Sequence, residues 1–587
     1  MTTTLVAVYV PIGFMGGLVG NLFVEFAFAL AGSVLISGVI ALTLSPMLSS
    51  RILKPASGHG RIEETVQHFF QSLANRYQAV LSKVLDHVPV TMTFAAIVLA
   101  SIYFMFVTTK TELAPVEDQG ILFVQISAPQ TATIDYVQTY AREMVKQFET
   151  IPEYRHSFLM LGGSGSPALS FGGFKMVASD QRKRSVFDVY PEIQGKVSKI
   201  PGVQVNMAPR PSLPGSGGGF PVQFVLTSPH NFTEMDRMAS QMLDDAMASG
   251  RFMFLRKSTE FSRPRTTMEI DRDRAAQLGI DMKEVGANLS AMLGGGYVNR
   301  FSLGGRSYEV IPQVARDFRA NHELLDAYHI RAGSGQLVPL SSIVRFKESV
   351  EPSKRTQFQQ LNAVTLEGVP AMGTTLGEAL DTLRGISEKR FTEGYHYDYT
   401  GESRQYSQEG NALIATFFLS ILVIYLVLAA QFESWRDPII ILVSVPMSIA
   451  GALIFLTLGA ATINIYTQVG LITLIGLIAK NGILIVDFAN RLQIKEGLDK
   501  RAAVVKAAAV RLRPILMTTV AMMVAMVPLL LANGPGAKSR FDIGLVISTG
   551  LGIGTLFTLF VVPTVYLVLA RDQRDRARAI QPHPATP

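Results

Sequence analysis

Eight stretches of about 20 residues carry no charge or almost none, and they limit the possible folds of this 587-residue chain more than any other feature. A helix of that length spans the ~30 Å hydrocarbon core of a bilayer. Because backbone polar groups must be satisfied internally in hydrocarbon, we predict that each stretch is a transmembrane helix. The stretches are residues 5–20, 23–48, 88–107, 411–432, 438–458, 463–486, 514–533 and 543–570.

The loops between these stretches differ in charge, and the difference orients the chain. Basic residues gather in residues 51–83, 491–513 and 571–578. Cytoplasmic loops carry an excess of Lys and Arg, so we expect these regions inside the cell and the long polar segment outside it. The predicted order is two spans in residues 1–50, a cytoplasmic segment in 51–87, a span in 88–107, a periplasmic domain in 108–408, five spans in 409–570 and a cytoplasmic tail in 571–587.

Residues 61–86 of the cytoplasmic segment carry apolar side chains at helical spacing, with charged residues between them. A helix in a soluble core and a helix lying on a membrane surface both show this pattern. The position of the segment between two predicted spans favours the membrane surface.

Composition excludes several classes of function. The chain has no cysteine, so it has no disulfide, thiolate metal site or cysteine nucleophile. Because it shows no phosphate-binding loop, zinc motif or hydrolase triad, we expect no enzyme activity, no cofactor and no metal site. The net charge of +7 lies beside the apolar stretches, where the positive-inside effect explains it better than nucleic-acid binding does.

The periplasmic domain mixes strand and helix patterns. The recurrence of strand, helix and strand predicts α+β subdomains of the split βαβ type, with boundaries near the glycine-rich residues 214–219 and 294–296. The strand-like segments are residues 121–127, 222–226, 266–270 and 308–314, and the helix-like segments are 133–150, 232–249, 274–278, 282–293 and 376–388.

The two ends of the chain resemble each other. Pro11 and Pro46 are 35 residues apart, and so are Pro528 and Pro563 in the last two spans. Duplicated halves are common in transporters, with the coupling site between the repeats. We therefore interpret residues 1–50 as the end of a first repeat and the rest of the chain as a complete second repeat.

Lys480 stands inside the sixth stretch, with no other charge between Gly470 and Asp487. An ammonium in hydrocarbon costs at least ~2.5 kcal/mol, so it normally marks an ion pathway and has a carboxylate partner. Its stem cannot reach the bilayer surface near Asn490, because ten residues of helix rise ~15 Å. Asp487 is ~10 Å away along the axis, so a direct pair with Lys480 is not expected, and Asp487 is interpreted as a residue near the cytoplasmic end.

Several motifs occur in one order along the whole chain. They resemble the motifs of the resistance-nodulation-division transporters, specifically the hydrophobe/amphiphile efflux branch that exports drugs. The motifs are Leu293-Gly-Gly-Gly-Tyr297-Val-Asn299, Tyr399-Thr-Gly401-Glu402, Gln431-Phe-Glu-Ser434-Trp435, Gly476-Leu-Ile-Ala-Lys480-Asn481, and Arg511-Leu-Arg-Pro514 with Thr518 after it.

The resemblance implies a homotrimer that couples inward proton flow to export. It implies that Lys480 belongs to a proton relay with Thr518 and Arg511 as helpers. The carboxylate partners of the lysine would be two adjacent aspartates in a span that this chain does not contain. The fold expected is therefore a polytopic α-helical membrane protein with a large α+β periplasmic domain, a C-terminal portion and N-terminally truncated form of the family fold.

The relay residues have simpler interpretations as well. Protonation of an acid would release the ammonium of Lys480 to change partner, which makes a workable switch. The Thr518 hydroxyl can equally form a hydrogen bond within its own helix. Arg511 can be explained by the excess of basic residues on the cytoplasmic side alone. We expect Gly550, Gly552 and Gly554 to allow close packing of helices.

The resemblance also places the substrate in a pocket lined by aromatic residues and a flexible loop of the first periplasmic subdomain. The matching stretch is residues 156–167, where glycine and serine stand in positions that often hold phenylalanine. Phe158, Met160 and Met176 are the candidate substrate-binding residues, although each is also a common core residue. Residues 285–350 resemble the docking subdomain that meets an outer-membrane channel.

We therefore expect a multi-pass protein of the inner membrane that exports drugs or other amphiphilic small molecules. Its expected partners are a periplasmic adaptor protein and an outer-membrane channel. Two alternatives stay open. One is an accessory half-subunit that needs a separately encoded N-terminal half. The other is a metal-ion exporter of the same superfamily, although the 23 methionines are scattered through apolar spans, where methionine commonly fills packing gaps.

Overall fold

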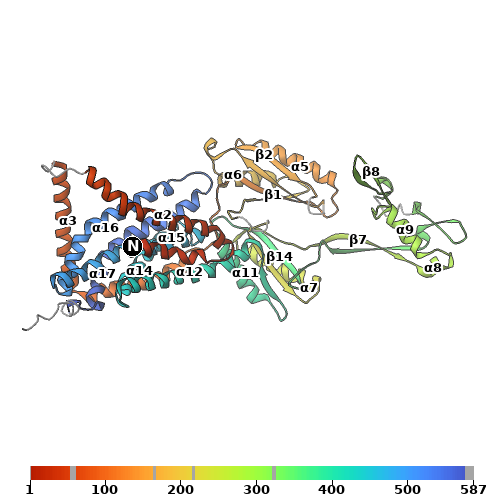
Figure 1. Ribbon diagram of the computed structural model, residues 1–587. Helices are drawn as coiled ribbons and strands as arrows, with labels where there is room; N and C mark the ends of the chain where they lie inside the picture. Colours follow the sequence, from red (N-terminus) through yellow and green to blue (C-terminus); the bar gives the residue numbers. More distant parts are fainter. Residues whose placement is uncertain (1, 53–60, 163–166, 214–218, 320–325, 575–587) are drawn as a thin grey trace, which may run out of the picture. The chain divides into compact units, whose positions relative to one another are not determined.

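The computed structural model of the protein describes residues 2–52, 61–162, 167–213, 219–319 and 326–574 (Figure 1). It divides into two compact units, Met1–Ser258 with Thr356–Pro587, and Thr259–Arg355. The predicted boundary at residues 214–218, part of the predicted substrate loop at 163–166 and most of the predicted tail lie outside the described residues.

Seven of the described helices are long and apolar enough to cross a membrane, and they overlap seven of the eight predicted spans. α13 and α14 together form one of them. The helices are α2 (Gly17–Ile52), α4 (Val88–Thr108), α12 (Gly401–Phe432), α13 (Asp437–Leu442), α14 (Ser444–Thr457), α15 (Ile465–Glu496), α16 (Lys500–Leu530) and α17 (Ala537–Leu569).

The apolar stretch of residues 5–20 is not one continuous helix in the structure. Helix α1 covers only Thr2–Gly13, and α2 already begins at Gly17, whose positive φ of 79° closes the turn between them. Glycine adopts this left-handed conformation without the strain that a side chain would bring.

The matched prolines occupy equivalent places in their helices. Pro11 lies two residues before the end of α1, and Pro528 lies two before the end of α16. Pro46 lies six residues before the end of α2, and Pro563 lies six before the end of α17. The agreement in both pairs supports the repeat inferred from the sequence.

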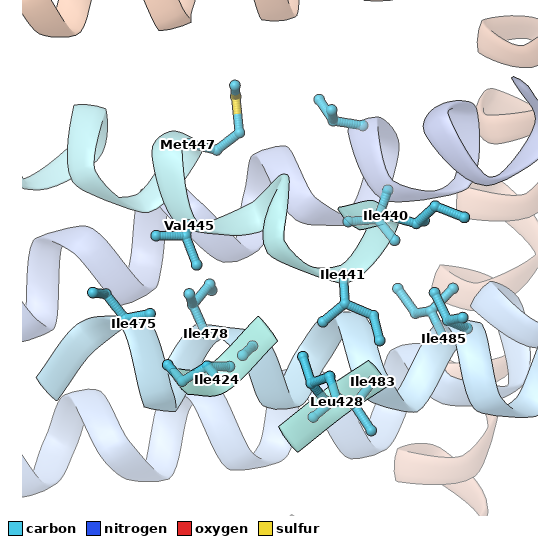
Figure 2. Close-up of a cluster of buried hydrophobic side chains, with 14 of the residues drawn as sticks. Ile424, Leu428, Ile440, Ile441, Val445, Met447, Ile475, Ile478, Ile483 and Ile485 are labelled. Carbon is cyan, nitrogen blue, oxygen red and sulfur yellow. The ribbon is translucent and has the colours of Figure 1, made fainter. Parts of the chain in front are cut away.

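An apolar core joins α12, α13, α14 and α15. Figure 2 shows Ile441 of α13 directed toward Leu428 of α12 and Ile483 of α15, and all three are buried. Lipid tails are as apolar as these side chains, so transfer from water contributes little to helix association in a bilayer. The contacts therefore stabilise the bundle mainly through close packing.

Glycines bring the helix backbones together. A Cβ atom at Gly554 of α17 would lie 1.9 Å from the hydroxyl oxygen of Ser448 in α14, and one at Gly550 would lie 2.3 Å from Leu474 of α15. The predicted packing role of these two glycines is confirmed. Gly552 differs, because its Cβ would meet only the flexible end of Met523 at 3.2 Å.

Helix α3 (Arg61–Asp86) runs across the ends of α16 and α17 (Figure 1). The hydroxyl of Tyr77 donates a hydrogen bond of 2.5 Å to the carbonyl of Leu559, and the guanidinium of Arg513 lies over the Phe70 ring at 5.0 Å. An orientation across the spans agrees with the prediction of a helix on the membrane surface.

The first α/β subdomain covers one face of a sheet with two helices. Its four strands are antiparallel in the order β2-β3-β1-β4, and its core contains Phe148 of α5, Phe174 of β3 and Val189 of α6. Ser185 and Asp188 form a capping box at the start of α6. The elements are β1 (Ile121–Ser127), α5 (Ile134–Glu149), β2 (Tyr154–Met160), β3 (Leu169–Met176), η1 (Ser179–Gln181), α6 (Val186–Val197) and β4 (Gln204–Pro209).

The second α/β subdomain has five strands, in the order β13-β14-β5-β15 with β6 also paired to β14. Its last strand runs through Thr400 directly into α12, so backbone joins this subdomain to a membrane helix. The elements are β5 (Val222–Ser228), α7 (Phe232–Ala248), β6 (Phe252–Lys257), β13 (Thr356–Phe358), β14 (Leu361–Pro370), α11 (Leu376–Arg390) and β15 (His396–Tyr399).

The unit Thr259–Arg355 is wider than the predicted docking segment of residues 285–350, because the long paired strands β7 and β12 belong to it. The strand predicted for residues 308–314 ends at Val310, since Pro312 lacks the N–H that a continuing ladder needs. The elements are β7 (Phe261–Ile270), α8 (Arg272–Gln277), α9 (Met282–Met292), β8 (Asn299–Leu303), β9 (Arg306–Val310), α10 (Arg316–Arg319), β10 (His329–Arg331), β11 (Leu337–Pro339), η3 (Leu340–Ser342) and β12 (Val344–Pro352).

Candidate functional site

Lys480 lies near the middle of α15, and its side chain is half-buried among the membrane helices. One turn before it, α1 approaches so closely that a Cβ at Gly476 would lie 2.9 Å from Val8. Within the described ranges, the ammonium makes no hydrogen bond or ion pair. A cation in this position needs a carboxylate or a water-filled cavity, so the site is chemically incomplete in the part of the chain that the structure describes.

A buried chain of polar side chains begins at the residue after the lysine. The amide nitrogen of Asn481 donates to the hydroxyl of Thr555 in α17 at 3.1 Å, and that hydroxyl lies 3.3 Å from the hydroxyl of Thr519 in α16. The amide oxygen of Asn481 is buried without a partner among the described residues. Three helices are thus connected beside Lys480 by groups that sequence reasoning missed. The Asn481 position next to the lysine was the only signal for them.

The two predicted helper residues lie on α16. Thr518 donates its hydroxyl to the carbonyl of Ile515 in its own helix at 3.1 Å, which is the simpler alternative for that residue. The guanidinium of Arg511 lies over the ring of Phe488 in α15 at 4.6 Å, and its Nε atom is buried with no partner in the described ranges. No hydrogen bond between described residues joins either side chain to Lys480, so their relay roles stay predictions.

Asp487 pairs with Arg491 at 3.0 Å, and no contact of the described residues links it to Lys480. This agrees with its interpretation as a residue near the end of the span. A second polar cluster follows, because Asn490 donates to Asp437 of α13 at 3.2 Å and accepts from the hydroxyl of Tyr566 in α17 at 2.6 Å. These bonds hold α13, α15 and α17 together at the end remote from the α/β subdomains.

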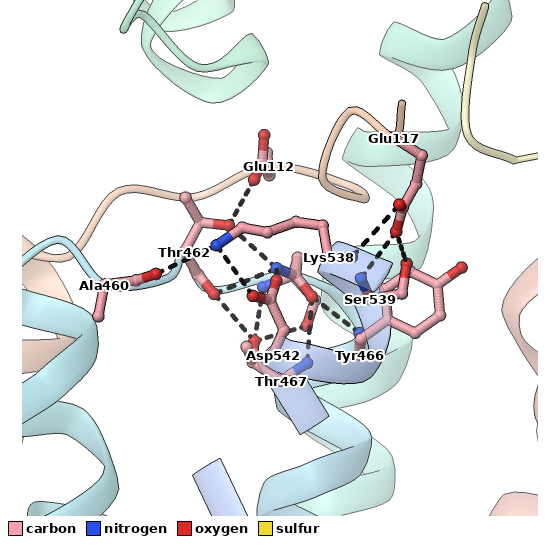
Figure 3. A network of polar contacts seen from close by, with 10 residues as sticks. Glu112, Glu117, Ala460, Thr462, Tyr466, Thr467, Lys538, Ser539 and Asp542 are labelled. Atoms are coloured by element: carbon pink, nitrogen blue, oxygen red, sulfur yellow. Dashed lines mark hydrogen bonds and ion pairs between the residues drawn. The ribbon is translucent and has the colours of Figure 1, made fainter. Parts of the chain in front are cut away.

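A larger polar network lies where the helices meet the α/β subdomains (Figure 3). Asp542 of α17 is fully buried and accepts a hydrogen bond of 2.8 Å from the side chain of Asn464, the N-cap of α15. Lys538 lies 3.3 Å from the other carboxylate oxygen of Asp542 and also donates to the carbonyl of Ala460 at 3.1 Å. The network places a cation and an amide beside the buried carboxylate, which offset part of the cost of its burial.

The segment before β1 also enters this network. Glu112 donates its N–H to the carbonyl of Ile463 at 3.0 Å and accepts a hydrogen bond of 2.5 Å from the hydroxyl of Thr462. Burial raises the pKa of the Glu112 carboxyl, the bond from Thr462 opposes the rise, and the nearby negative charge of Asp542 adds to it. These two hydrogen bonds join the connection between α4 and β1 to the loop between α14 and α15.

The predicted substrate residues divide between two faces of the first sheet. Phe158 and Met160 of β2 lie on the open face, where their exposed fractions are 56% and 48%, together with exposed Phe123 and Phe171. Met176 is fully buried on the face that α5 and α6 cover. The structure thus brings Phe158 and Met160 together and separates Met176 from them.

A glycine shapes the open face. Gly173 of β3 stands directly opposite Phe123 on one side and Phe158 on the other. A Cβ at this position would lie 2.7 Å from the Phe158 ring, so the ring covers the backbone where a side chain would otherwise stand. The exposed side chains of this face are apolar and mostly aromatic, which suits contact with apolar molecules.

Comparison with known proteins identifies the family of the chain. Residues 1–570 match the model of the AcrB/AcrD/AcrF family. An uncharacterized transporter of Haemophilus influenzae is 39% identical over 581 residues, covering 98% of this chain and 56% of that protein. The toluene efflux pump membrane transporter TtgB of Pseudomonas putida is 30% identical over 580 residues, covering 96% and 55%. The multidrug export protein AcrF of Escherichia coli is 28% identical over 587 residues, covering 96% and 56%.

The chain spans about half the length of these curated relatives. The family match extends from the first helix to the end of α17, and it includes Lys480 and both α/β subdomains. The chain therefore belongs to the AcrB/AcrD/AcrF family of resistance-nodulation-division efflux transporters, which are multi-pass proteins of the inner membrane.

Proposed function

We propose that this protein takes part in the proton-driven export of drugs or other amphiphilic small molecules. The observation that carries the proposal is Lys480, a half-buried cation in a membrane helix that has no partner among the described residues. An intramembrane cation is costly and is retained for ion movement or its control. The names of two relatives, a toluene efflux pump and a multidrug export protein, support apolar small molecules as the substrates.

The proposal includes the assembly expected for this family. The protein works as the inner-membrane component of a tripartite pump, as a homotrimer with a periplasmic adaptor and an outer-membrane channel. The unit Thr259–Arg355 supplies the docking surface, and the order β1-α5-β2-β3-α6-β4 supports a split βαβ type for the first subdomain. Lys480, Thr518 and Arg511 act together in the relay, with carboxylates outside the described residues as acceptors.

Export is expected in cells that produce the complete transporter with its adaptor and channel. A fluorescent amphiphilic dye should leave these cells faster than it leaves cells without the transporter, and a protonophore should abolish the difference. Export that continues after the proton gradient collapses would rule out proton coupling. A transporter that exports copper or silver ions and no dye would favour the metal-exporting alternative.

The open face of the first sheet is proposed as part of the substrate pocket. F158A or M160A should raise the KM for export about tenfold with little change in kcat, because an apolar contact worth about 1.4 kcal/mol is lost from bound substrate. M247A changes another methionine of comparable exposure, on α7, and should leave KM unchanged. M176A should instead destabilise the protein by about 2 to 5 kcal/mol, since it empties a core position. Unchanged dye KM values in both F158A and M160A would remove this face from the pocket.

A further inference from the structure

Residues 109–120 form the only covalent link from α4 to β1, and two adjacent carboxylates stand near its end. Glu117 and Asp118 are bonded to different parts of the molecule, one to a membrane helix and one to the first α/β subdomain. Neither residue belongs to the relay or to the open face. The α17 partner of Glu117 lies 422 positions away in the sequence, and the partners of Asp118 on the first subdomain lie 64 and 68 positions away.

Glu117 binds the first turn of α17 (Figure 3). Its Oε1 atom accepts the N–H of Ser539 at 2.7 Å and the Ser539 hydroxyl, and its Oε2 atom accepts the N–H of Lys538 at 3.3 Å. The residue is only 5% exposed. A carboxylate at a helix N-terminus satisfies orphan N–H groups and is favoured by the helix dipole, so this attachment is strong.

Asp118 binds the first α/β subdomain. Its Oδ1 atom lies 2.5 Å from Nη2 of Arg182, whose side chain is nearly fully buried, and it also accepts the N–H of Gly120 at 3.1 Å. Its Oδ2 atom accepts the N–H of Val186 in the first turn of α6 at 3.2 Å. The side chains of two consecutive residues therefore bind the first turn of α17 and the first turn of α6.

The attachment of α17 leads back to the lysine helix. α17 is bonded to α15 through Thr555 and Asn481, the residue next to Lys480, and again through Asp542 and Asn464. Loss of the bonds from α17 to the buried Glu117, or from Asn464 to the buried Asp542 of α17, would leave a buried carboxylate without these partners, which is unfavourable. A shift of α17 is therefore expected to move the segment that carries Glu117 and Asp118.

The start of α2 receives a carboxylate in the same manner. Glu409 of α12 is buried and accepts the N–H of Leu18 at 3.0 Å, in the first turn of α2. Helices α2 and α17 are the equivalent last helices of the two repeats. Each one is thus tied at its start to a segment that continues into an α/β subdomain, which argues that the tie at Glu117 is part of the architecture and not a chance contact.

We infer that Glu117 and Asp118 form a coupling clamp, through which a change at Lys480 is carried by α17 to the first α/β subdomain. The inference rests on the proposed function, because it assigns the clamp to the transfer between ion switch and substrate face. Glu117 and Asp118 are positioning residues. They act through α17 and α6 and touch neither the ion nor the substrate.

A double-mutant cycle in the transporter isolated whole from its membrane tests the clamp. Hydrogen exchange of residues 182–190 is measured in the wild type, K480M, E117A and the double variant. K480M should change the exchange rate of these amides by about fivefold in the wild-type background, the lower end of typical coupling effects, and should change it by less than about twofold when Glu117 is absent. An equal change in both backgrounds, or no change in either, overturns the clamp.

Further variants separate coupling from folding. E117D keeps a carboxylate and should restore part of the K480M response, while E149A removes an exposed glutamate of α5 in the same subdomain and should leave the response complete. If E117A does not fold, E117Q replaces it, since the amide keeps an acceptor for α17 and loses the charge. The change in hydrogen exchange caused by K480M should then fall by about half. A full change in E117Q overturns the clamp. Export by the wild type tests the proposed function separately, because the hydrogen-exchange measurements need no proton gradient.

Discussion

Replacing Lys480 by methionine is expected to lower proton-coupled export by about 100-fold or more, the scale of loss typical when a proton-transfer group is removed. Methionine has a similar length and no charge, so it occupies the same space in α15 and cannot exchange partners with carboxylates. The thermal unfolding temperature of K480M should be unchanged or higher, because an intramembrane charge is costly. Dye export and proton uptake in proteoliposomes, together with the unfolding temperature, measure the two effects.

The chain offers a matched control for this change. Lys495 lies on the same helix but is exposed near its end, and K495M should export like the wild type. A loss of export in both variants would show that the charge of α15 matters and its position does not. Normal export by K480M would remove the lysine from the mechanism altogether.

Replacing Gly554 by alanine is expected to destabilise the membrane bundle by about 1 to 3 kcal/mol, as overpacking of a tight interior does. The added Cβ would fall 1.9 Å from the hydroxyl oxygen and 2.8 Å from the Cα atom of Ser448, so the backbones of α14 and α17 must separate. Smaller side chains at such positions allow the close helix approach on which association in lipid depends. The unfolding temperature and the fraction of monodisperse protein in detergent should both fall.

Gly552 is the control for this effect, two residues away in the same helix. Its added Cβ would meet the Sδ and Cε atoms of Met523 at 3.2 to 3.4 Å, and methionine can change rotamer to make room. G552A should therefore be neutral or slightly stabilising, because alanine favours helix by about 1 kcal/mol over glycine. Equal destabilisation by G552A and G554A would mean that the close approach of α17 to Ser448 of α14 is not the reason for the effect at Gly554.

Properties that depend on local sequence could be predicted for this protein. Long apolar stretches predicted the positions of seven long apolar helices, and the strand and helix patterns located β1, α5, β5, α7 and α11. The stretch at residues 5–20 shows the limit of that reasoning. Apolarity continues through residues 5–20, but Gly17 turns the backbone, and a composition window does not respond to one dihedral angle.

The candidate sites were only partly predictable. Lys480 is conspicuous in sequence because an isolated charge in an apolar helix is costly, and the structure finds it half-buried. The adjacent residues Thr518 and Thr519 could not be distinguished by sequence pattern, because both are hydroxyls on one helix. Only the rotation of α16 directs Thr519 toward Thr555 and leaves Thr518 bonded to its own helix.

By itself, the sequence determined that this protein is a membrane protein with a large aqueous part, and that it carries an ionisable group inside a span. Those properties follow from hydrophobicity, charge and periodicity, which are summed over neighbouring residues. Tertiary structure alone decided that Met176 is core and Phe158 is surface, and that Glu117 binds Ser539 across 422 positions of the chain. The reason is physical. A contact between distant segments depends on how helices and strands are packed in three dimensions, and no local pattern records that packing.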